Sequence, residues 1–257
     1  MGVTDGTMRF YREKLQRYFT SVDYLKATKQ DIERYLAGIP ANKYGLGNRN
    51  SHFRAVRTFH KWLESEYSIP SPVEGMTPPK LTKSVFPTLD ITEIEYLIQA
   101  SENVRDKAII SLFVESGLRL AELAAIKTSD INWKERLIKV RCKGQKDTWA
   151  TYGESTESFL KQWLKEYDPK ANKANECIWN LSYWGITQML KRLEKKTDIK
   201  CNPHVFRRSF ASILRKKGLD SLMIRDLGRW QSVEMVSRYT RAVDFGDTMK
   251  LYKAPLG

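Results

Sequence analysis

The segment CNPHVFRRSFASILRKKG, residues 201–218, places a histidine and an arginine three positions apart at an expected helix start. Asn202 can cap the first free amides, and Pro203 suits the first helical position. His204 and Arg207 then share one helix face near the N-terminus, where the helix dipole favours an anion. Taken alone, this pattern usually marks a capped, solvated surface helix, and a phosphate-binding group is the alternative.

The apolar side chains of the same helix mark the side that we expect to be buried. They are Phe206, Phe210, Ile213 and Leu214. We therefore expect His204 and Arg207 to project together away from the core.

Two earlier segments carry residues that would suit the same chemistry. In SGLRLAEL, Gly117 can break two helical stretches, and Arg119 and Glu122 follow, three residues apart. Taken alone, this pair predicts an ion pair within one helix. The turn CKGQKD carries Lys143 and Lys146, which are ordinary polar turn residues unless they lie at a site.

A fourth segment, LGRWQSVEMVSRYTRA, carries Trp230 and, nine residues later, Tyr239. A lone aromatic residue in such a stretch is usually a core residue or an interface anchor. With the other segments, however, it completes a set suited to a phosphoryl group. Guanidinium forks match phosphate oxygens, so Arg119 and Arg207 would suit a phosphate.

The elements that must position these residues fall into two groups. Residues 1–68 contain three or four amphipathic patterns and predict helices alone, whereas 69–89, with five prolines, predicts a linker. Helical patterns then resume, and only residues 136–153 predict strands, as two runs around a turn. We expect a mainly α fold with a small β-sheet, in two domains, 1–80 and 81–257.

The helix expected within NRNSHFRAVRTFHKWLES has an apolar face and a basic face. The apolar residues are Phe53, Val56, Phe59 and Leu63, and the basic ones on the opposite side are Arg54, Arg57 and Lys61. Such a helix can dock by one side and offer cations to phosphates with the other. A solvated basic face is an equal alternative for this helix alone.

The composition restricts the class of protein and of partner. The 257-residue chain carries a formal net charge of +14, which favours a polyanion, nucleic acid first and an acidic membrane second. No apolar run approaches the roughly 18 to 20 residues that cross a bilayer, and the N-terminal residues lack a secretory signal pattern, so we expect a soluble, cytoplasmic protein. Cys142, Cys177 and Cys201 are too widely spaced to indicate a disulfide framework or a zinc site.

The order of the four segments resembles the tyrosine recombinase family, also called phage integrases. GLRLAEL resembles the segment of the family's first arginine, CKGQKD its lysine hairpin, PHVFRRSFASILRKKG its H-x-x-R helix and LGRWQSVEMVSRYTR the segment that ends in its nucleophile. The N-terminal part resembles the family's helical core-binding domain. Two positions differ, since Arg208 and Trp230 stand where the family commonly has histidine.

The resemblance implies that a tyrosine attacks a DNA phosphodiester, forms a 3′-phosphotyrosyl intermediate and releases a 5′-hydroxyl. The implied roles are Tyr239 as nucleophile, Arg119 and Arg207 as phosphate clamp, Trp230 as neutral donor, His204 as base or orienting group, Lys143 as general acid with Lys146 as its alternative, and Glu122 as support. Neither a metal nor a nucleotide cofactor is expected, because the phosphotyrosyl bond conserves the energy of the phosphoester.

The implied partner is double-stranded DNA, held between the two domains by a homodimer or homotetramer. Residues 240–257 are expected to form either a helix that docks on a neighbouring protomer or a disordered tail. Two alternatives stay open. One is a type IB topoisomerase, which shares this chemistry, although the short chain argues against it. The other is a helical DNA-binding protein without catalysis, although the complete set of reactive residue types argues against it.

Overall fold

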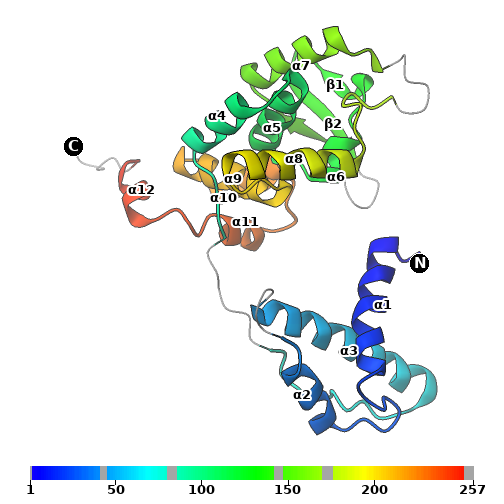
Figure 1. Ribbon diagram of the computed structural model, residues 1–257. Coiled ribbons are helices and arrows are strands. Elements are labelled where there is room, and N and C mark those ends of the chain that lie inside the picture. Colours follow the sequence, from blue (N-terminus) through cyan, green and yellow to red (C-terminus); the bar gives the residue numbers. More distant parts are fainter. Residues whose placement is uncertain (1, 41–44, 80–85, 142–146, 170–175, 252–257) are drawn as a thin grey trace. The chain divides into compact units, whose positions relative to one another are not determined.

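The computed structural model describes residues 2–40, 45–79, 86–141, 147–169 and 176–251 (Figure 1). The chain divides into two compact units, residues 1–84 and 85–257. The described part is mainly helical with one small sheet, as the sequence predicts. None of its helices is long and apolar enough to cross a membrane.

The first unit contains α1 (Asp5–Phe19), α2 (Lys29–Ala37) and α3 (Gly45–Tyr67). Thr28 and Asp31 form a reciprocal capping box at the start of α2. The core of the unit includes Ile32, Phe53 and Val56, each at most 1% exposed. The apolar face predicted for α3 is therefore the face that packs inward.

Two histidines of α3 lie inside this core, each bound to a tyrosine. The Nδ1 atom of His52 lies 2.7 Å from the Tyr35 hydroxyl, and the Nε2 atom of His60 lies 2.7 Å from the Tyr18 hydroxyl. Burial lowers the pKa of each imidazole to about 4, and the charges of Lys14 and Arg17 add to the effect at His52. Both imidazoles are therefore neutral core residues at pH 7.

The proline-rich segment is more ordered than a linker would be. Val73 is 4% exposed and belongs to the core of the first unit, and Met76 packs against that core. The side-chain amide of Asn50 donates to the Pro79 carbonyl at 3.0 Å. At the other end, Leu89 lies in the core of the second unit. The linker interpretation was thus too broad, because Val73 and Met76 pack on the first core and Leu89, after the last proline, packs on the second.

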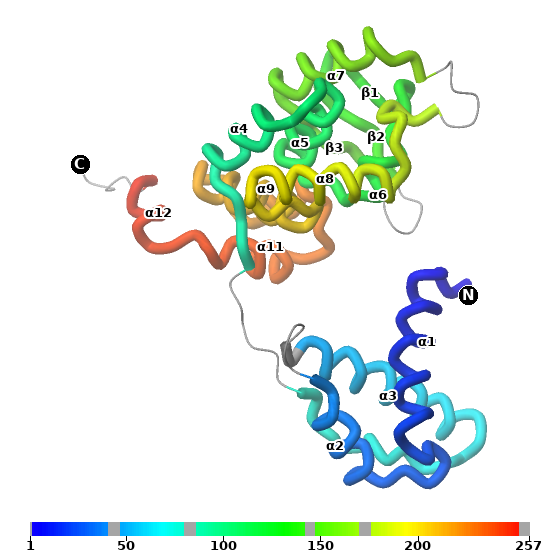
Figure 2. The backbone as a smooth tube through the Cα atoms, viewed as in Figure 1, coloured from blue at the N-terminus to red at the C-terminus, as the bar shows by residue number. Residues whose placement is uncertain are grey.

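The second unit surrounds one deeply buried helix. Its helices are α4 (Ile91–Ala100), α5 (Val104–Ser116), α6 (Leu120–Ala124), α7 (Glu154–Glu166), α8 (Tyr183–Thr197), α9 (Pro203–Lys216), α10 (Ser221–Gly228), α11 (Val233–Tyr239) and α12 (Phe245–Met249), with a 3₁₀ turn at Thr128–Asp130. Helix α5 packs against α7 and α9 (Figures 1 and 2), and Ile109, Leu112 and Phe113 are fully buried on it. The stacked rings of Phe113 and Phe206, with centroids 5.7 Å apart, join α5 to α9.

The sheet is antiparallel, with strand order β1 (Ile131–Asn132), β2 (Leu137–Arg141) and β3 (Asp147–Thr151). Strands β2 and β3 are the predicted pair, with Lys139 opposite Trp149. Strand β1 was not predicted, because two residues are too few to show an alternating pattern. Lys143 and Lys146 lie outside the described residues.

The chain end and the cysteines complete the second unit. Helix α12 is joined to the end of α9 by an ion pair of 3.1 Å between Lys216 and Asp247. Cys177 is half-buried and Cys201 is buried, and burial raises the pKa of the Cys201 thiol to about 12. Cys142 lies outside the described residues.

Candidate active site

Arg119 is placed by a sharp turn between α5 and α6. Gly117 ends α5 in the left-handed conformation, with φ of 59°, and a Cβ there would lie 2.6 Å from the Phe210 ring. Arg119 then caps α6, where its backbone N–H donates to Glu122 Oε2 at 2.9 Å and its Nη1 to Glu122 Oε1 at 2.6 Å. The Glu122 side chain is 6% exposed and that of Arg119 is 43% exposed, so the carboxylate fixes a guanidinium that solvent can reach.

Arg207 lies beneath this turn, on α9. Asn202 caps the helix by accepting from the Val205 N–H at 3.0 Å, and Pro203 is the first helical residue, as predicted. The side chain does not project away from the core: Arg207 is 4% exposed and donates to the carbonyls of Gly117 and Gly228, the latter at 2.6 Å. The expectation of a solvent-facing side chain was wrong, because the segments around Gly117 and Gly228 cover the polar side of α9.

The charge of Arg207 persists despite its burial. Burial lowers the pKa of the guanidinium to about 10, and the nearby charges of Arg119 and Arg229 add to the effect. This value is still well above 7. Arg207 is therefore a fixed cation, held by two backbone carbonyls from different turns.

Trp230, in the turn between α10 and α11, packs against Arg207, and Tyr239 of α11 packs against Trp230. The Arg207 guanidinium carbon lies 4.4 Å from the centre of the Trp230 ring, and the rings of Trp230 and Tyr239 are 5.6 Å apart. Trp230 is 5% exposed, and its buried indole N–H has no hydrogen-bond partner in the part of the chain that the structure describes. In this arrangement the ring supports Arg207, and donation by its N–H to a phosphate stays a prediction.

The Tyr239 phenol faces the arginines of α9. Tyr239 is the last residue of α11 and is half-buried. Negative charge on its oxygen would raise the pKa values of both Arg207 and Arg208. The phenol and the two guanidiniums therefore lie close enough to interact electrostatically.

His204 is exposed on the first turn of α9, one turn from Arg207. Its pKa lies below the usual range because of partial burial and the charges of Arg208, Arg207 and Arg119. The imidazole is thus neutral at pH 7 and able to accept a proton. The structure brings together Arg119, Glu122, His204, Arg207, Trp230 and Tyr239.

Arg208, one of the two departures from the family pattern, has a structural role. Its guanidinium carbon lies 5.1 Å from the centre of the Phe86 ring. The next residue, Ser209, accepts from the Leu89 N–H at 2.7 Å. These contacts attach the entry segment of the second unit to the helix that carries His204 and Arg207.

Arg229 is a polar residue at the site that the sequence analysis missed. Its side chain is 4% exposed, donates to the Ser116 carbonyl at 3.0 Å and lies 3.9 Å from Glu122 Oε2. The available signal was its place directly before Trp230, between two segments already singled out. A basic residue in a basic chain gave no reason to expect burial.

A hollow of about 990 Å³ extends from Arg119 along the sheet. Its lining includes Lys127, Lys139, Arg141, Gln231 and Met235. Lys139 is paired with Asp147 at 2.7 Å. The lining also includes the acidic Glu122, Asp130 and Asp147, so the hollow carries charges of both signs, and the open side of Arg119 is one of its accessible cations.

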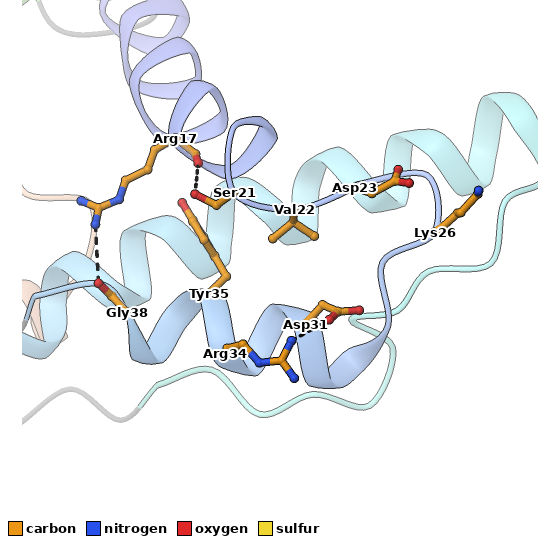
Figure 3. A pocket seen from close by; sticks show the side chains of 9 residues that line it. All are labelled: Arg17, Ser21, Val22, Asp23, Lys26, Asp31, Arg34, Tyr35 and Gly38. Carbon is orange, nitrogen blue, oxygen red and sulfur yellow. Dashed lines mark hydrogen bonds and ion pairs between the residues drawn. The ribbon is translucent and has the colours of Figure 1, made fainter.

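The first unit offers exposed cations at the predicted positions. Arg54, Arg57 and Lys61 are exposed on α3, and none forms an ion pair with another described residue. The unit also has a hollow of about 380 Å³ (Figure 3), but there Arg17 donates to the Gly38 carbonyl at 3.5 Å and Arg34 pairs with Asp31 at 3.2 Å. The outer face of α3 is therefore the better candidate for binding phosphates.

The described residues contain no cluster of side chains able to hold a metal ion.

Comparison with known proteins gives a family match, Phage integrase family, over residues 87–244. The chain therefore belongs to the phage integrase family. The named relatives support the activity of a site-specific tyrosine recombinase.

Curated relatives match almost the whole chain. The chain is 26% identical to the tyrosine recombinase XerA of Saccharolobus solfataricus, over 94% of this chain and 84% of the relative. It is 28% identical to the tyrosine recombinase XerC of Staphylococcus epidermidis, over 92% of this chain and 86% of the relative.

Solved structures show the same fold. A crystal structure of XerA recombinase matches with a TM-score of 0.58 and 26% identity, over 97% of this chain and 91% of that one. A lambda integrase dimer bound to a COC′ core site matches with a TM-score of 0.76 and 18% identity, over 100% of this chain and 94% of that one.

Proposed function

We propose that this phage integrase family member cleaves and rejoins strands of double-stranded DNA at specific sites through a 3′-phosphotyrosyl intermediate on Tyr239. The observation that carries the proposal is the contact of Trp230 with both Arg207 and Tyr239, since it brings a phenol beside a buried, charged guanidinium. Arg119 adds a second guanidinium with an open side.

In the proposed reaction, the Tyr239 oxygen attacks the phosphorus, and the bond from phosphorus to the 5′ oxygen breaks. The phenolic proton passes to His204, which is neutral at pH 7. Arg207 and Arg119 stabilise the negative charge on the phosphoryl oxygens in the transition state. Rejoining is the reverse reaction, in which the 5′-hydroxyl of another strand attacks the phosphotyrosyl bond.

The leaving 5′ oxygen needs a proton, and Lys143 is proposed as its donor, with Lys146 as the alternative. Both lysines lie outside the described residues, so the proposal rests on their place in the CKGQKD turn. Sulfur in place of the bridging 5′ oxygen separates the two, because a departing thiolate hardly needs an acid. The alanine variant of the true acid should regain cleavage on that substrate, and the other variant should not.

Tyr239 suits the role of nucleophile better than the buried tyrosines do. Burial raises the pKa values of Tyr35 and Tyr152 to about 12, and Tyr152 is only 5% exposed. A DNA phosphate cannot approach a hydroxyl buried in a core. Tyr239 is half-buried and lies beside Arg207 and Arg208.

Residues 1–80 are proposed as a core-binding domain and 81–257 as the catalytic domain. The exposed Arg54, Arg57 and Lys61 of α3 would contact DNA phosphates. The solved lambda integrase is a dimer bound to a core site, which supports assembly of this chain as a homodimer or homotetramer on DNA. A DNA partner also implies a cytoplasmic, DNA-associated location.

The test is covalent capture from a pool of nicked duplexes of randomised sequence. The nick lets the cleaved end diffuse away, so that the adduct accumulates and survives SDS. The wild-type chain should yield adducts that share a sequence. Tyr239→Phe should bind the selected duplex with an affinity within about twofold and form no adduct, since it lacks only the attacking hydroxyl. Tyr152→Phe is the matched control and should form adducts normally.

Other outcomes would replace the proposal with one of its alternatives. Binding without any adduct would indicate a non-catalytic DNA-binding protein. An adduct without sequence preference, together with relaxation of supercoiled plasmid and no exchange between two selected sites, would indicate a type IB topoisomerase.

A further inference from the structure

Arg229 is an unusual residue for its backbone position. It ends α10 in the left-handed conformation, with φ of 56°, which glycine adopts without strain and an arginine does not. Its guanidinium is also buried, which is costly for a charge without partners. Backbone strain and the burial of its charge both destabilise Arg229, so we expect its guanidinium to make compensating contacts.

The contacts of Arg229 join separate elements of the second unit. Nη2 donates to the Ser116 carbonyl at 3.0 Å, at the end of α5. Nη1 donates to the Leu227 carbonyl at 2.8 Å, on its own helix, and lies 3.5 Å from the Trp149 carbonyl of β3. The guanidinium therefore sits where α5, α10 and the sheet meet, directly behind the turn that carries Arg119.

The same guanidinium faces the carboxylate that fixes Arg119. Arg229 Nη2 lies 3.9 Å from Glu122 Oε2, and that oxygen also accepts the backbone N–H of Arg119. The other oxygen, Oε1, accepts Arg119 Nη1 at 2.6 Å. Glu122 thus lies between an exposed arginine in front and a buried arginine behind.

This arrangement solves an electrostatic problem of the site. A carboxylate beside a phosphate repels it, and a buried carboxylate needs compensation. Arg229 supplies a positive charge on the side of Glu122 away from solvent. We propose that Arg229 is a positioning residue that holds the Glu122 carboxylate in place and thereby fixes Arg119 for phosphate binding.

The proposal deepens the proposed function and rests on it only for the role of Arg119 in cleavage. Two variants separate charge from shape. Arg229→Met keeps a long side chain without charge, whereas Arg229→Lys keeps the charge opposite Glu122. Thermal unfolding of both variants shows that the comparison is made between folded proteins.

The first measurement is the single-turnover rate of adduct formation on the duplex selected by the wild-type chain. We expect Arg229→Met to be slower by about tenfold to a hundredfold, because Arg119 is no longer held in the productive geometry. Arg229→Lys should stay within about threefold of wild type. The double variant Glu122→Gln with Arg229→Met should react at nearly the same rate as Glu122→Gln alone, because Arg229 acts through the Glu122 carboxylate. Independent, multiplied losses in the double variant would overturn the proposal.

The second measurement needs no DNA, so it distinguishes failure of this inference from failure of the proposed function. In crystal structures of the variants, Arg229→Lys should keep both contacts between Arg119 and Glu122, and Arg229→Met should lose at least one. If both contacts persist in Arg229→Met, Arg229 does not position Glu122, whatever the chain does to DNA.

Discussion

The two units use histidine in opposite ways. In the first unit, His52 and His60 are 3% and 1% exposed, each bonded to a tyrosine hydroxyl, and burial keeps them neutral. In the second unit, His204 is exposed at the start of α9 and surrounded by arginines. The chain has three histidines, so this division covers all of them.

The difference shows that surroundings, rather than residue type, assign a histidine its role. His52 and His60 lie in the interior of α3, among apolar residues that pack inward. His204 lies at a helix N-terminus, with Arg207 one turn later. A neutral imidazole inside a core stabilises the fold, whereas a neutral imidazole beside fixed cations can take a proton from a nucleophile.

The largest expected effect concerns Arg207. Arg207→Ala should slow adduct formation by about 10³-fold, because a fixed cation is lost from the transition state. It should also lower the free energy of unfolding by about 1–3 kcal/mol, because the Gly117 and Gly228 carbonyls lose their donor. Single-turnover kinetics and urea unfolding measure the two effects. Arg192→Ala, at an exposed position on α8, is the control and should change neither.

Substituting one histidine in each unit tests the comparison between the units. His204→Gln should slow adduct formation by about 10²-fold, the usual size of a general-base contribution, with no change in the melting temperature. His60→Gln should lower the melting temperature and leave the adduct rate unchanged. If His60→Gln slowed the reaction as much as His204→Gln, the comparison between the units would be wrong.

Acid should unfold the first unit before the second. The folded-state pKa values of His52 and His60 are about 4, below the ordinary value of about 6.5, so the unfolded state binds protons first as the pH falls. Their contribution is complete above pH 6.5 and is lost between pH 6.5 and 4, by roughly 3 kcal/mol for each histidine.

Hydrogen exchange of the whole chain at pH 7 and pH 5, corrected for intrinsic rates, measures this loss for each unit. Amides of α3 should lose protection at pH 5, while those of α5 keep it. The double variant His52→Gln and His60→Gln should remove the pH dependence of the first unit. Equal loss of protection in α3 and α5 would argue against the histidines as its cause.

The smallest effect is expected at Gly75 of the first unit, which is compared with Gly117 of the second unit, since both glycines have a positive φ. Gly75→Ala meets open space at φ of 68° and should cost about 1 kcal/mol of backbone strain. Gly117→Ala has the same strain and also places a Cβ 2.6 Å from the Phe210 ring, so it should cost about 1–3 kcal/mol more. Differential scanning calorimetry measures both. A similar loss in the two variants would show that Phe210 shifts without cost.

The sequence predicted the helices and turns that carry the site residues better than it predicted which of those residues are buried. Helix caps, apolar periodicity and the break at Gly117 are local features, and each is present in the structure. The burial of Arg207 and Arg229 was not predictable, because the carbonyls that bind them come from residues up to 113 positions away. Val73 was also missed, since a single apolar residue among prolines shows no periodicity.

The most direct test of the account is the position of the covalent bond. The adduct captured from the wild-type chain is digested with nuclease and protease, and mass spectrometry locates the nucleotide that remains on the protein. The account predicts one modified residue, Tyr239, linked to a 3′-phosphate. A remnant on any other residue, or a linkage through a 5′-phosphate, would contradict it.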